Sequence, residues 1–542
     1  MILDRLTSPE FIWAGAALSG VAIHLGLFIR GEWHVHSPDI LCTYGALVAV
    51  STLAGIVYET SLAGQALAFH LLGLTASIVI YRIFFHRLTR AGFPGPFWAR
   101  FTKLGHVWYS RHSKNNLYLH ELNAKYGDVV RTGPAEVTVF LPEAPEVMTS
   151  RHSNCVKAEF YDLIWPEKAL FAARDRSVHS RRRRDWQPAF SPQAIRHYEE
   201  KVLSHINELD QQLELKAKTG AVVNVTDFLL WFTFDLMGDF TFSTPFGVLK
   251  GNDPRSHEMI LQIKNARVLL GPLTPVPWLL HIGTKLLPRV LWIKDWYESV
   301  DWCQEQIQAR LAKGPSPELR DLTYYIMEKE KENKVDAGPW LRGDSLLAVL
   351  AGSEPTAQAL AAVLHELVLH PEHIDKLHAE LADTPLTDNN ALTELPHLNA
   401  VIQEAMRLHP FLPTGGIRKT TDTGVTIRDV YIPPHTTVLT PLYTISRRED
   451  CFQQGSSFIP ERWTTRPEMV LNPAAHAPFS LGKYNCIGQH LAMRMMRYTL
   501  ARIIKKYKFC HPPGVDGREM EGEKADRFTS FAGPVPLVFE LR

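Results

Sequence analysis

A single cysteine lies in a glycine-flanked loop near the end of the sequence, within APFSLGKYNCIGQHLAMRMM at 477–496. Gly482 and Gly488 flank Cys486, and glycine permits backbone angles and close approaches that a Cβ forbids. Apolar residues at helical spacing follow, so we expect Cys486 at or just before a helix N-terminus, where backbone N–H groups favour a thiolate. A thiolate presented in this way suits ligation of haem iron, whereas the structural alternative is a small buried hydrophobe.

An acid and a base lie three residues apart in NAVIQEAMRLHP at 399–410. On a helix, the side chains of Glu404 and Arg407 meet on one face. An exposed pair of this kind contributes only about 0.2–0.5 kcal/mol, but apolar neighbours on both sides favour burial. FIPERW at 458–463 adds Arg462, and two guanidiniums can satisfy one carboxylate from two sides.

The segment 343–371, GDSLLAVLAGSEPTAQALAAVLHELVLHP, has the pattern of a largely buried helix. We expect Asp344 to be its N-cap and the helix to end before Pro371. Glu354 and Pro355 in its middle are costly in a buried helix and indicate a function. Because proline has no N–H, the carbonyl of Ala351 loses its helical partner and becomes available to hold water.

Together these stretches resemble the cytochrome P450 family. Its haem-binding signature, Phe-x-x-Gly-x-Arg-x-Cys-x-Gly, is similar to the sequence at Phe479, Gly482, Cys486 and Gly488. Its Glu-x-x-Arg element and the third member of its buried structural triad are similar to Glu404, Arg407 and Arg462. Residues 351–356 resemble its oxygen-activating motif. The resemblance implies that Cys486 is the axial ligand of the haem iron.

The sequence departs from the family pattern at two positions. Tyr484 replaces the signature arginine that pairs with a haem propionate, and tyrosine can hydrogen-bond a carboxylate without neutralising it. Pro355 replaces the first threonine of the oxygen-activating motif, which in the family helps to deliver protons. We hypothesise that Glu354, water and Thr356 form the proton route here.

Further basic residues match propionate-binding positions of the family. His179 and Arg183 lie at i and i+4 within RDRSVHSRRRRDWQPAFSP, 174–192, and Arg418 lies in PTGGIRKTTDTG, 413–424. The resemblance implies that all three contact haem, so that Arg183 and Arg418 compensate for Tyr484. The alternative for the arginine run is a solvated basic face, whose outward members could meet an acidic electron donor.

Three apolar stretches open the chain, at 11–29, 40–57 and 62–81, each close to the roughly 20 residues that span a bilayer. We expect up to three transmembrane helices, with buried core helices as the alternative and a re-entrant form possible for the second. A basic flank follows at 82–103, so the rest of the chain should face the cytosol from a membrane, as at the endoplasmic reticulum. The histidines of WHVH, 33–36, are either loop residues or metal ligands.

The 542 residues are 45% hydrophobic with a formal net charge of +1, which argues against a nucleic-acid-binding role. Helical patterns at 193–218, 227–240, 344–370, 391–408 and 487–506, with strand patterns at 128–141 and 425–440, predict a mainly α fold with small β-sheets. The expected organisation is a membrane anchor at 1–92 followed by a catalytic domain with the cytochrome P450 fold at 93–542.

The resemblance implies a haem-thiolate monooxygenase with heme b (iron protoporphyrin IX). No glycine-rich dinucleotide fingerprint follows a strand, so electrons from NADPH would come through a membrane-bound NADPH–cytochrome P450 reductase. The Tyr-containing loop is similar to fungal members that tailor lipophilic secondary metabolites, and segments 269–288 and 160–171 would form a lid and a pocket wall. One alternative is a haem-thiolate enzyme that rearranges or dehydrates its substrate without activating O₂. Another is a multi-span membrane protein without a cofactor.

Overall fold

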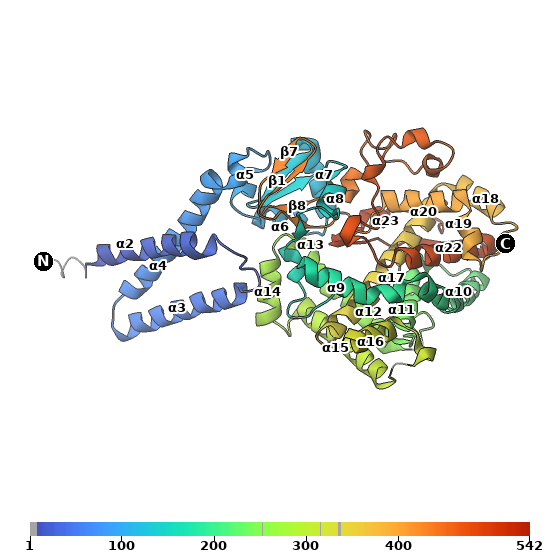
Figure 1. Cartoon of the computed structure of the whole chain (residues 1–542), viewed down its shortest axis with the longest axis horizontal. Coiled ribbons are helices and arrows are strands. Elements are labelled where there is room, and N and C mark those ends of the chain that lie inside the picture. Colours follow the sequence, from blue (N-terminus) through green and yellow to red (C-terminus); the bar gives the residue numbers. More distant parts are fainter. Residues whose placement is uncertain (1–7, 252, 315, 334–337) are drawn as a thin grey trace.

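The computed structural model describes residues 8–251, 253–314, 316–333 and 338–542. Three apolar helices project from one side of a larger, mainly helical body, and the C-terminus lies at the far end of that body (Figure 1). The arrangement divides the molecule into a projecting part and a body that contains all of the proposed chemistry.

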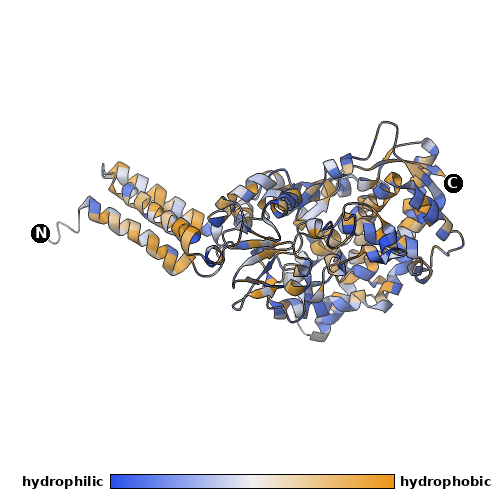
Figure 2. Ribbon diagram, turned by 90° about the horizontal axis from the view of Figure 1, so that it is seen from above, coloured by the Kyte–Doolittle hydropathy of each residue, from blue (hydrophilic) through white to orange (hydrophobic). Residues whose placement is uncertain are grey.

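The projecting part consists of α2 (Pro9–Ile23), α3 (Ser37–Val57) and α4 (Leu62–Ile80), and short π-helical turns continue α2 and α4 to Phe28 and Phe85. By length and composition these helices could cross a membrane, and their surfaces are strongly hydrophobic (Figure 2). The backbones of α2 and α4 touch at Gly20 and Gly73, where a Cβ would overlap the backbone of the neighbouring helix. Such close contact through small residues is typical of packing between membrane helices.

The body is built from helices. Its longer helices are α7 (Asn115–Tyr126), α9 (Arg176–Trp186), α10 (Pro192–Thr219), α11 (Val225–Phe242), α12 (Pro254–Ala266), α14 (Pro277–Leu286), α15 (Leu291–Ala312), α16 (Leu322–Asn333), α17 (Gly338–Leu369), α18 (Pro371–Glu380), α20 (Pro396–Leu408) and α22 (Gln489–Lys506). Shorter ones are α5 (Arg87–Arg90), α6 (Leu104–Ser110), α8 (Ala144–Thr149), α13 (Leu270–Leu273), α19 (Asn389–Thr393), α21 (Leu442–Ile445) and α23 (Glu519–Gly522). Of these, α10, α11 and α22 follow the predicted patterns closely, whereas the pattern at 391–408 is divided into α19 and α20 and the one at 344–370 begins earlier, at Gly338.

A five-stranded sheet lies at the side of the body that faces the anchor helices (Figure 1). Its order is β1 (Val129–Gly133), β2 (Glu136–Val139), β8 (Thr437–Leu439), β5 (Arg418–Lys419) and β3 (Val156–Lys157). The smaller sheets join β6 (Val425–Ile427) to β7 (Val430–Ile432), β10 (Ala525–Arg527) to β11 (Thr529–Phe531), and β4 (Val223–Asn224) to β12 (Pro536–Leu541) and β9 (Tyr507–Cys510). The prediction of a mainly α fold with small sheets is confirmed.

The core surrounds α17, which packs against α11, α15, α20 and α22. Residues 340–369 are apolar enough to span a membrane, but most of this stretch is buried inside the body. In α17 apolar side chains on all faces are buried because the helix lies at the centre of the core. The anchor helices, in contrast, expose their apolar side chains.

Asp344 does not cap α17, contrary to the sequence-based expectation, because the helix already begins at Gly338. Its buried carboxylate accepts hydrogen bonds from the Leu170 backbone N–H at 2.7 Å, Arg182 Nε at 2.6 Å and Trp186 Nε1 at 3.1 Å. The Asp344 side chain therefore ties α9 to α17. Burial raises the pKa of this carboxyl, against the opposing effect of Arg182.

We predict that Asp344→Ala lowers the free energy of unfolding by about 3 kcal/mol, because it leaves the Arg182 guanidinium buried without its main partner. Asp301→Ala is the matched control: its carboxylate pairs with Arg342 but is 68% exposed, so the loss should stay below about 1 kcal/mol. Denaturant unfolding followed by tryptophan fluorescence measures both. Equal losses would contradict the assigned role of Asp344.

Candidate active site

The loop that carries Cys486 is closed by its own backbone. The Cys486 N–H donates to the Phe479 carbonyl at 2.8 Å, and Gly488 caps α22, so the cysteine precedes the helix start as the sequence predicts. Gly482 has φ +62°, and a Cβ there would overlap the Thr149 carbonyl. A larger residue at this position would push the loop away from α8, and glycine is the residue that permits the turn.

The sulfur of Cys486 differs from those of the structural cysteines. Cys155, Cys303 and Cys451 are buried, whereas Cys486 is exposed to solvent. Protein atoms still surround Cys486 closely enough for burial to raise its thiol pKa. The N–H groups of Gly488 and Gln489 and the Arg183 guanidinium oppose this effect and favour the thiolate. The sulfur is both enclosed and accessible, which is the condition for binding a ligand and not for simple packing.

Arg183 holds the cysteine loop from α9. Its guanidinium donates to the Asn485 carbonyl at 2.6 Å and to Asn485 Oδ1 at 2.8 Å. His179, one turn earlier, is buried and packs edge-on against Tyr484, with ring centroids 4.9 Å apart. Burial and the neighbouring cations Lys157 and Arg183 lower the His179 pKa to about 3, so the imidazole is neutral at physiological pH.

Arg418 reaches the same place from the sheet. Its guanidinium lies 4.6 Å from the centre of the Tyr484 ring and donates to Tyr161 Oη at 2.8 Å. Strand pairing sets Arg418 directly opposite Lys157, a buried lysine that the sequence analysis did not single out. Like charges directly opposite each other in a sheet are destabilising, so the pairing favours a bound anion.

Three basic side chains lie over the Tyr484 ring, Lys157 and Lys483 at 5.3 Å and Arg418 at 4.6 Å from its centre, while Arg183 binds the neighbouring Asn485. Burial and the nearby Arg418 and Arg183 lower the Lys157 pKa well below its usual range, so a bound anion would favour its charged form. In the described part of the chain, all hydrogen bonds of Lys157, Arg183, Arg418 and Lys483 go to uncharged oxygen atoms. The Oη of Tyr484 and the Nε of Arg418 are buried and have no hydrogen-bond partner there. A ligand that placed its carboxylates beside Tyr484 would pair with the basic side chains and would give Tyr484 Oη and Arg418 Nε hydrogen-bond partners.

Glu404, Arg407 and Arg462 form one fully buried cluster behind the loop. Glu404 Oε1 accepts from Arg407 Nη2 at 2.8 Å and Arg462 Nε at 2.9 Å, and its other oxygen accepts from Trp463 Nε1 at 2.8 Å. Burial alone would raise the Glu404 pKa, but these donors outweigh burial and lower it. Arg407 also donates to three backbone carbonyls of segment 446–457, so the cluster fastens that segment to α20.

The middle of α17 presents Glu354 and Thr356, and both are buried. Helical structure continues through Pro355. Glu354 forms an ion pair with Arg267, which follows α12, while Thr356 Oγ1 donates to the Gly352 carbonyl at 3.1 Å. The sequence analysis missed Arg267, since a lone basic residue before an apolar lid carries no distinctive pattern.

A sequence model of the family Cytochrome P450 matches residues 94–532. The chain belongs to the cytochrome P450 family. It is 34% identical to the cytochrome P450 monooxygenase FCK2 of Fusarium pseudograminearum, with 96% of each chain covered. It is 33% identical to monooxygenase notG' of Aspergillus versicolor, with 99% of each covered. It is 32% identical to tryprostatin B 6-hydroxylase of Aspergillus fumigatus, covering 98% of this chain and 96% of that protein.

Membership makes this protein a P450 monooxygenase with a haem cofactor, and the alternative of a membrane protein without a cofactor is excluded. The residues present are suited to that group. Cys486 is exposed, and the basic groups Lys157, Arg418 and Lys483 around Tyr484, with Arg183 beside the cysteine loop, offer partners for the two haem propionates. Lys157 could not be identified from sequence because only the pairing of β3 with β5 brings it beside Arg418.

We predict that Lys157→Met speeds haem loss about tenfold, since one of the cations available to the propionates is removed. The same substitution should change apoprotein stability by less than about 1 kcal/mol, because removing the buried amine beside Arg418 offsets the loss of its hydrogen bonds to the Leu170 and Phe171 carbonyls. Haem transfer to a scavenging apoprotein and apoprotein unfolding measure the two effects. Lys508→Met, at an exposed position of β9, is the control. A destabilised apoprotein with unchanged haem retention would contradict the role.

Proposed function

We propose that this monooxygenase inserts one oxygen atom of O₂ into a lipophilic small molecule of fungal secondary metabolism. Electrons would come from NADPH through a membrane-bound reductase. The enclosed, accessible sulfur of Cys486 carries this proposal, together with the similarity to fungal monooxygenases that include a tryprostatin B hydroxylase. The two substitutions in the family pattern, Tyr484 and Pro355, are the features that the mechanism has to accommodate.

When bound, haem supplies the activation of dioxygen, and a thiolate ligand favours cleavage of the O–O bond. The protein supplies position and charge. Cys486 would hold the haem iron through its sulfur, and two N–H groups and Arg183 favour the thiolate against the effect of burial. Arg183, Arg418 and Lys157 would neutralise the propionates, so that Tyr484 needs only to donate a hydrogen bond. The neutral imidazole of His179 would pack with its edge against the Tyr484 ring.

Protons would reach the distal side from α17. Arg267 holds the Glu354 carboxylate beside the helix, and the carbonyl of Ala351 has no N–H partner at Pro355. That carbonyl can orient a water molecule, and the Glu354 carboxylate would take up a proton from the solvent side and pass it to this water, returning to the carboxylate paired with Arg267. The hydroxyl of Thr356 is bonded to Gly352 and is the second group in the proposed route.

The reductase would approach the face of α9. In the arginine run 181–184, Arg182 is buried against Asp344 and Arg183 holds the cysteine loop, whereas Arg181 and Arg184 are not buried. The run therefore has two inward members, which hold other parts of the body, and two outward members on a basic surface. Its outward members offer positive charge close to the Cys486 loop, where an acidic electron donor would dock.

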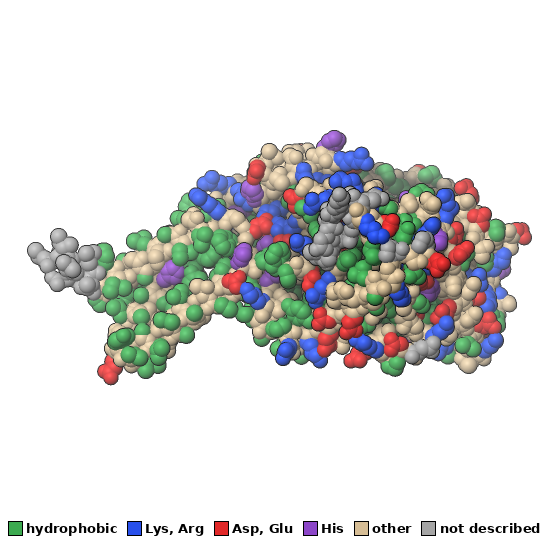
Figure 3. All heavy atoms as spheres, turned by 60° about the horizontal axis from the view of Figure 1, so that its bottom comes forward, with side chains coloured by type: hydrophobic (Ala, Val, Ile, Leu, Met, Phe, Trp, Pro, Cys, Tyr) green, Lys and Arg blue, Asp and Glu red, His purple; other side chains and the backbone are tan. Residues whose placement is uncertain are grey.

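The membrane anchor would place the body on the cytosolic side of the endoplasmic reticulum. Hydrophobic side chains cover the projecting helices, while charged side chains concentrate on the body (Figure 3). An anchored enzyme takes its substrate from the bilayer, which agrees with a lipophilic substrate.

A second candidate is rearrangement or dehydration of an oxygenated substrate without O₂ activation, and Pro355 in place of the usual threonine favours it. Incubation of reductase-containing membranes with fungal extracts, NADPH and ¹⁸O₂ separates the two. Monooxygenation gives NADPH-dependent products that carry one ¹⁸O atom. Products without ¹⁸O would support the second candidate and contradict the first.

We predict that Cys486→Ser abolishes the strongly red-shifted ferrous–CO absorption band and the NADPH-dependent product, because a serine hydroxyl does not replace the thiolate. Difference spectra of the purified protein measure the first effect. Cys510→Ser, at an exposed cysteine of β9, should leave the spectrum unchanged. Survival of the band in the Cys486 variant would refute the proposed ligand.

We also predict that Glu354→Gln lowers coupled turnover by about tenfold or more, with uncoupled oxygen consumption rising, because the proton donor is lost. Thr356→Ala should have a smaller effect in the same direction. Glu354→Asp keeps the carboxylate facing Arg267 and should retain most of the coupling. Product formed per NADPH consumed is the measurement. Unchanged coupling in both the Gln and Ala variants would exclude this route.

A further inference from the structure

The segment between the first two anchor helices, residues 29–36 and here called the linker, is bonded to the body by ion pairs. The Glu32 carboxylate accepts hydrogen bonds from Arg174 Nη1 and Nη2, at 2.7 and 2.9 Å, and from Lys419 Nζ at 2.6 Å. His34 Nε2 lies 2.7 Å from Asp162 Oδ2. The linker is thus joined to the sheet and to the pocket-wall segment 160–171.

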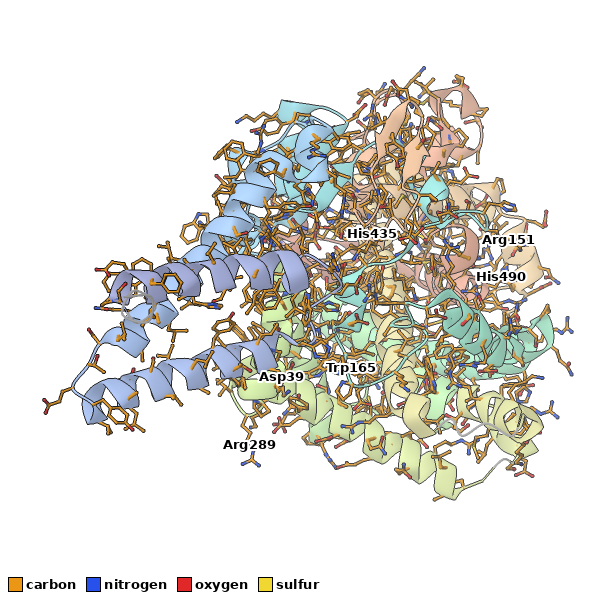
Figure 4. The ribbon with its side chains drawn as sticks, turned by 60° about the vertical axis from the view of Figure 1, so that its left-hand side comes forward. Asp39, Arg151, Trp165, Arg289, His435 and His490 are labelled. Carbon is orange, nitrogen blue, oxygen red and sulfur yellow. The ribbon has the colours of Figure 1, made fainter. Side chains whose placement is uncertain are left out.

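The start of α3 is bonded to the lid, residues 269–288, which contain α13 and α14. Ser37 Oγ donates to the Trp278 carbonyl at 2.8 Å, and Asp39 forms an ion pair with Lys285. Figure 4 shows Asp39 at the start of α3, beside α14. The anchor therefore contacts the two segments that the sequence analysis assigned to lid and wall.

The contacts differ in strength. The Asp39–Lys285 pair is more than half exposed on both sides and contributes little. The Glu32 cluster is more enclosed: burial alone would raise the Glu32 pKa, but hydrogen bonds from Arg174 and Lys419 hold it well below its usual range. Ligand atoms of Glu32, His34 and Asp162 lie within 4.8 Å of one another, but the Arg174 guanidinium already joins the two carboxylates. Ion pairing, and not a metal, explains the cluster.

The linker contacts fix the direction of the anchor helices. Because the linker touches the body, it lies on the body's side of any membrane that the helices cross. The turn between α3 and α4, around Glu59, lies at the far end of the projecting helices (Figure 1). The 21 residues of α3 are about 31 Å long, enough to cross the hydrocarbon core once. Three crossings would follow, with the start of α2 at Pro9 and the turn at Glu59 on the side opposite the body.

A cavity of about 350 Å³ lies where linker, lid and wall meet. His34 from the linker, Trp278 from the lid, and Glu159 and Phe160 from the wall line it. The Phe160 ring lies 4.5 Å from that of Phe528, which belongs to the aromatic cluster next to Arg418. Phe160 therefore links this cavity to the aromatic cluster whose Tyr161 hydroxyl accepts from Arg418, and the volume is sufficient for a small molecule.

We propose that the linker forms one wall of the substrate entrance and that this cavity is a vestibule, which an apolar molecule enters from the bilayer before passing Phe160. The vestibule role rests on the proposed function, whereas the docking of the linker does not. The membrane anchor then forms part of the ligand path and also attaches the enzyme to the membrane. Breaking the ion pairs of Glu32 with Arg174 and Lys419 would open the vestibule.

Cross-linking in native membranes tests the docking. In a Cys42→Ala background, Asp39→Cys with Lys285→Cys should be joined by a short bis-maleimide, detected as a cross-linked peptide by mass spectrometry. Glu59→Cys with Lys285→Cys is the control and should not be joined. In sealed vesicles with the body outward, a membrane-impermeant maleimide should label the thiol introduced at position 285 and not the thiol introduced at position 59. Joining of neither pair, or labelling at position 59, would overturn the arrangement.

Ligand entry tests the vestibule. Imidazole and a biphenylmethyl-imidazole both bind ferric haem with a spectral shift, and they differ in size. Cross-linking positions 39 and 285 should slow association of the large probe about tenfold and leave that of imidazole unchanged, while Glu32→Gln should speed only the large probe. Equal effects on both probes, or none, would overturn the vestibule. A protein that shows no spectral shift would instead contradict the haem site, and the cross-link would still report the docking.

Discussion

The proposed haem ligand is a sulfur anion in an enclosed part of the body, and the rest of the site depends on how that charge is stabilised. Burial disfavours a thiolate, so positive electrostatic potential has to be provided by fixed groups. At Cys486 these are the first N–H groups of α22 and the Arg183 guanidinium. Their positions require the Gly482 turn, the helix start at Gly488 and the buried Glu404 cluster that fastens the neighbouring segment.

The same region contains more positive charge than the protein neutralises. Lys157 and Arg418 are paired across two strands, and Arg183 and Lys483 approach from α9 and the cysteine loop. Such a group is unfavourable in an empty protein and favourable around two carboxylates. Replacement of the signature arginine by Tyr484 is therefore balanced by charge drawn from the sheet. The ligand and the fold stabilise each other through this charge.

The anchor and the body are also connected more closely than a simple tether requires. Glu32 contacts Arg174 and the sheet, His34 contacts the wall, and Ser37 and Asp39 contact the lid. In a membrane enzyme whose ligand arrives from the bilayer, the elements next to the lipid control access. The proposed vestibule assigns that task jointly to the linker and the lid.

The sequence by itself determined the family, the mainly helical fold, the three apolar helices and the order of the motifs, because periodicity and local spacing are properties of neighbouring residues. It also placed Cys486 before a helix and Glu404 beside Arg407, which are local relations. Only the tertiary structure decided that Asp344 joins two helices instead of capping one, that Arg267 holds Glu354, and that Lys157 faces Arg418. Those contacts join residues that lie 87 to 261 positions apart, or that are set by strand register, and no local pattern encodes them.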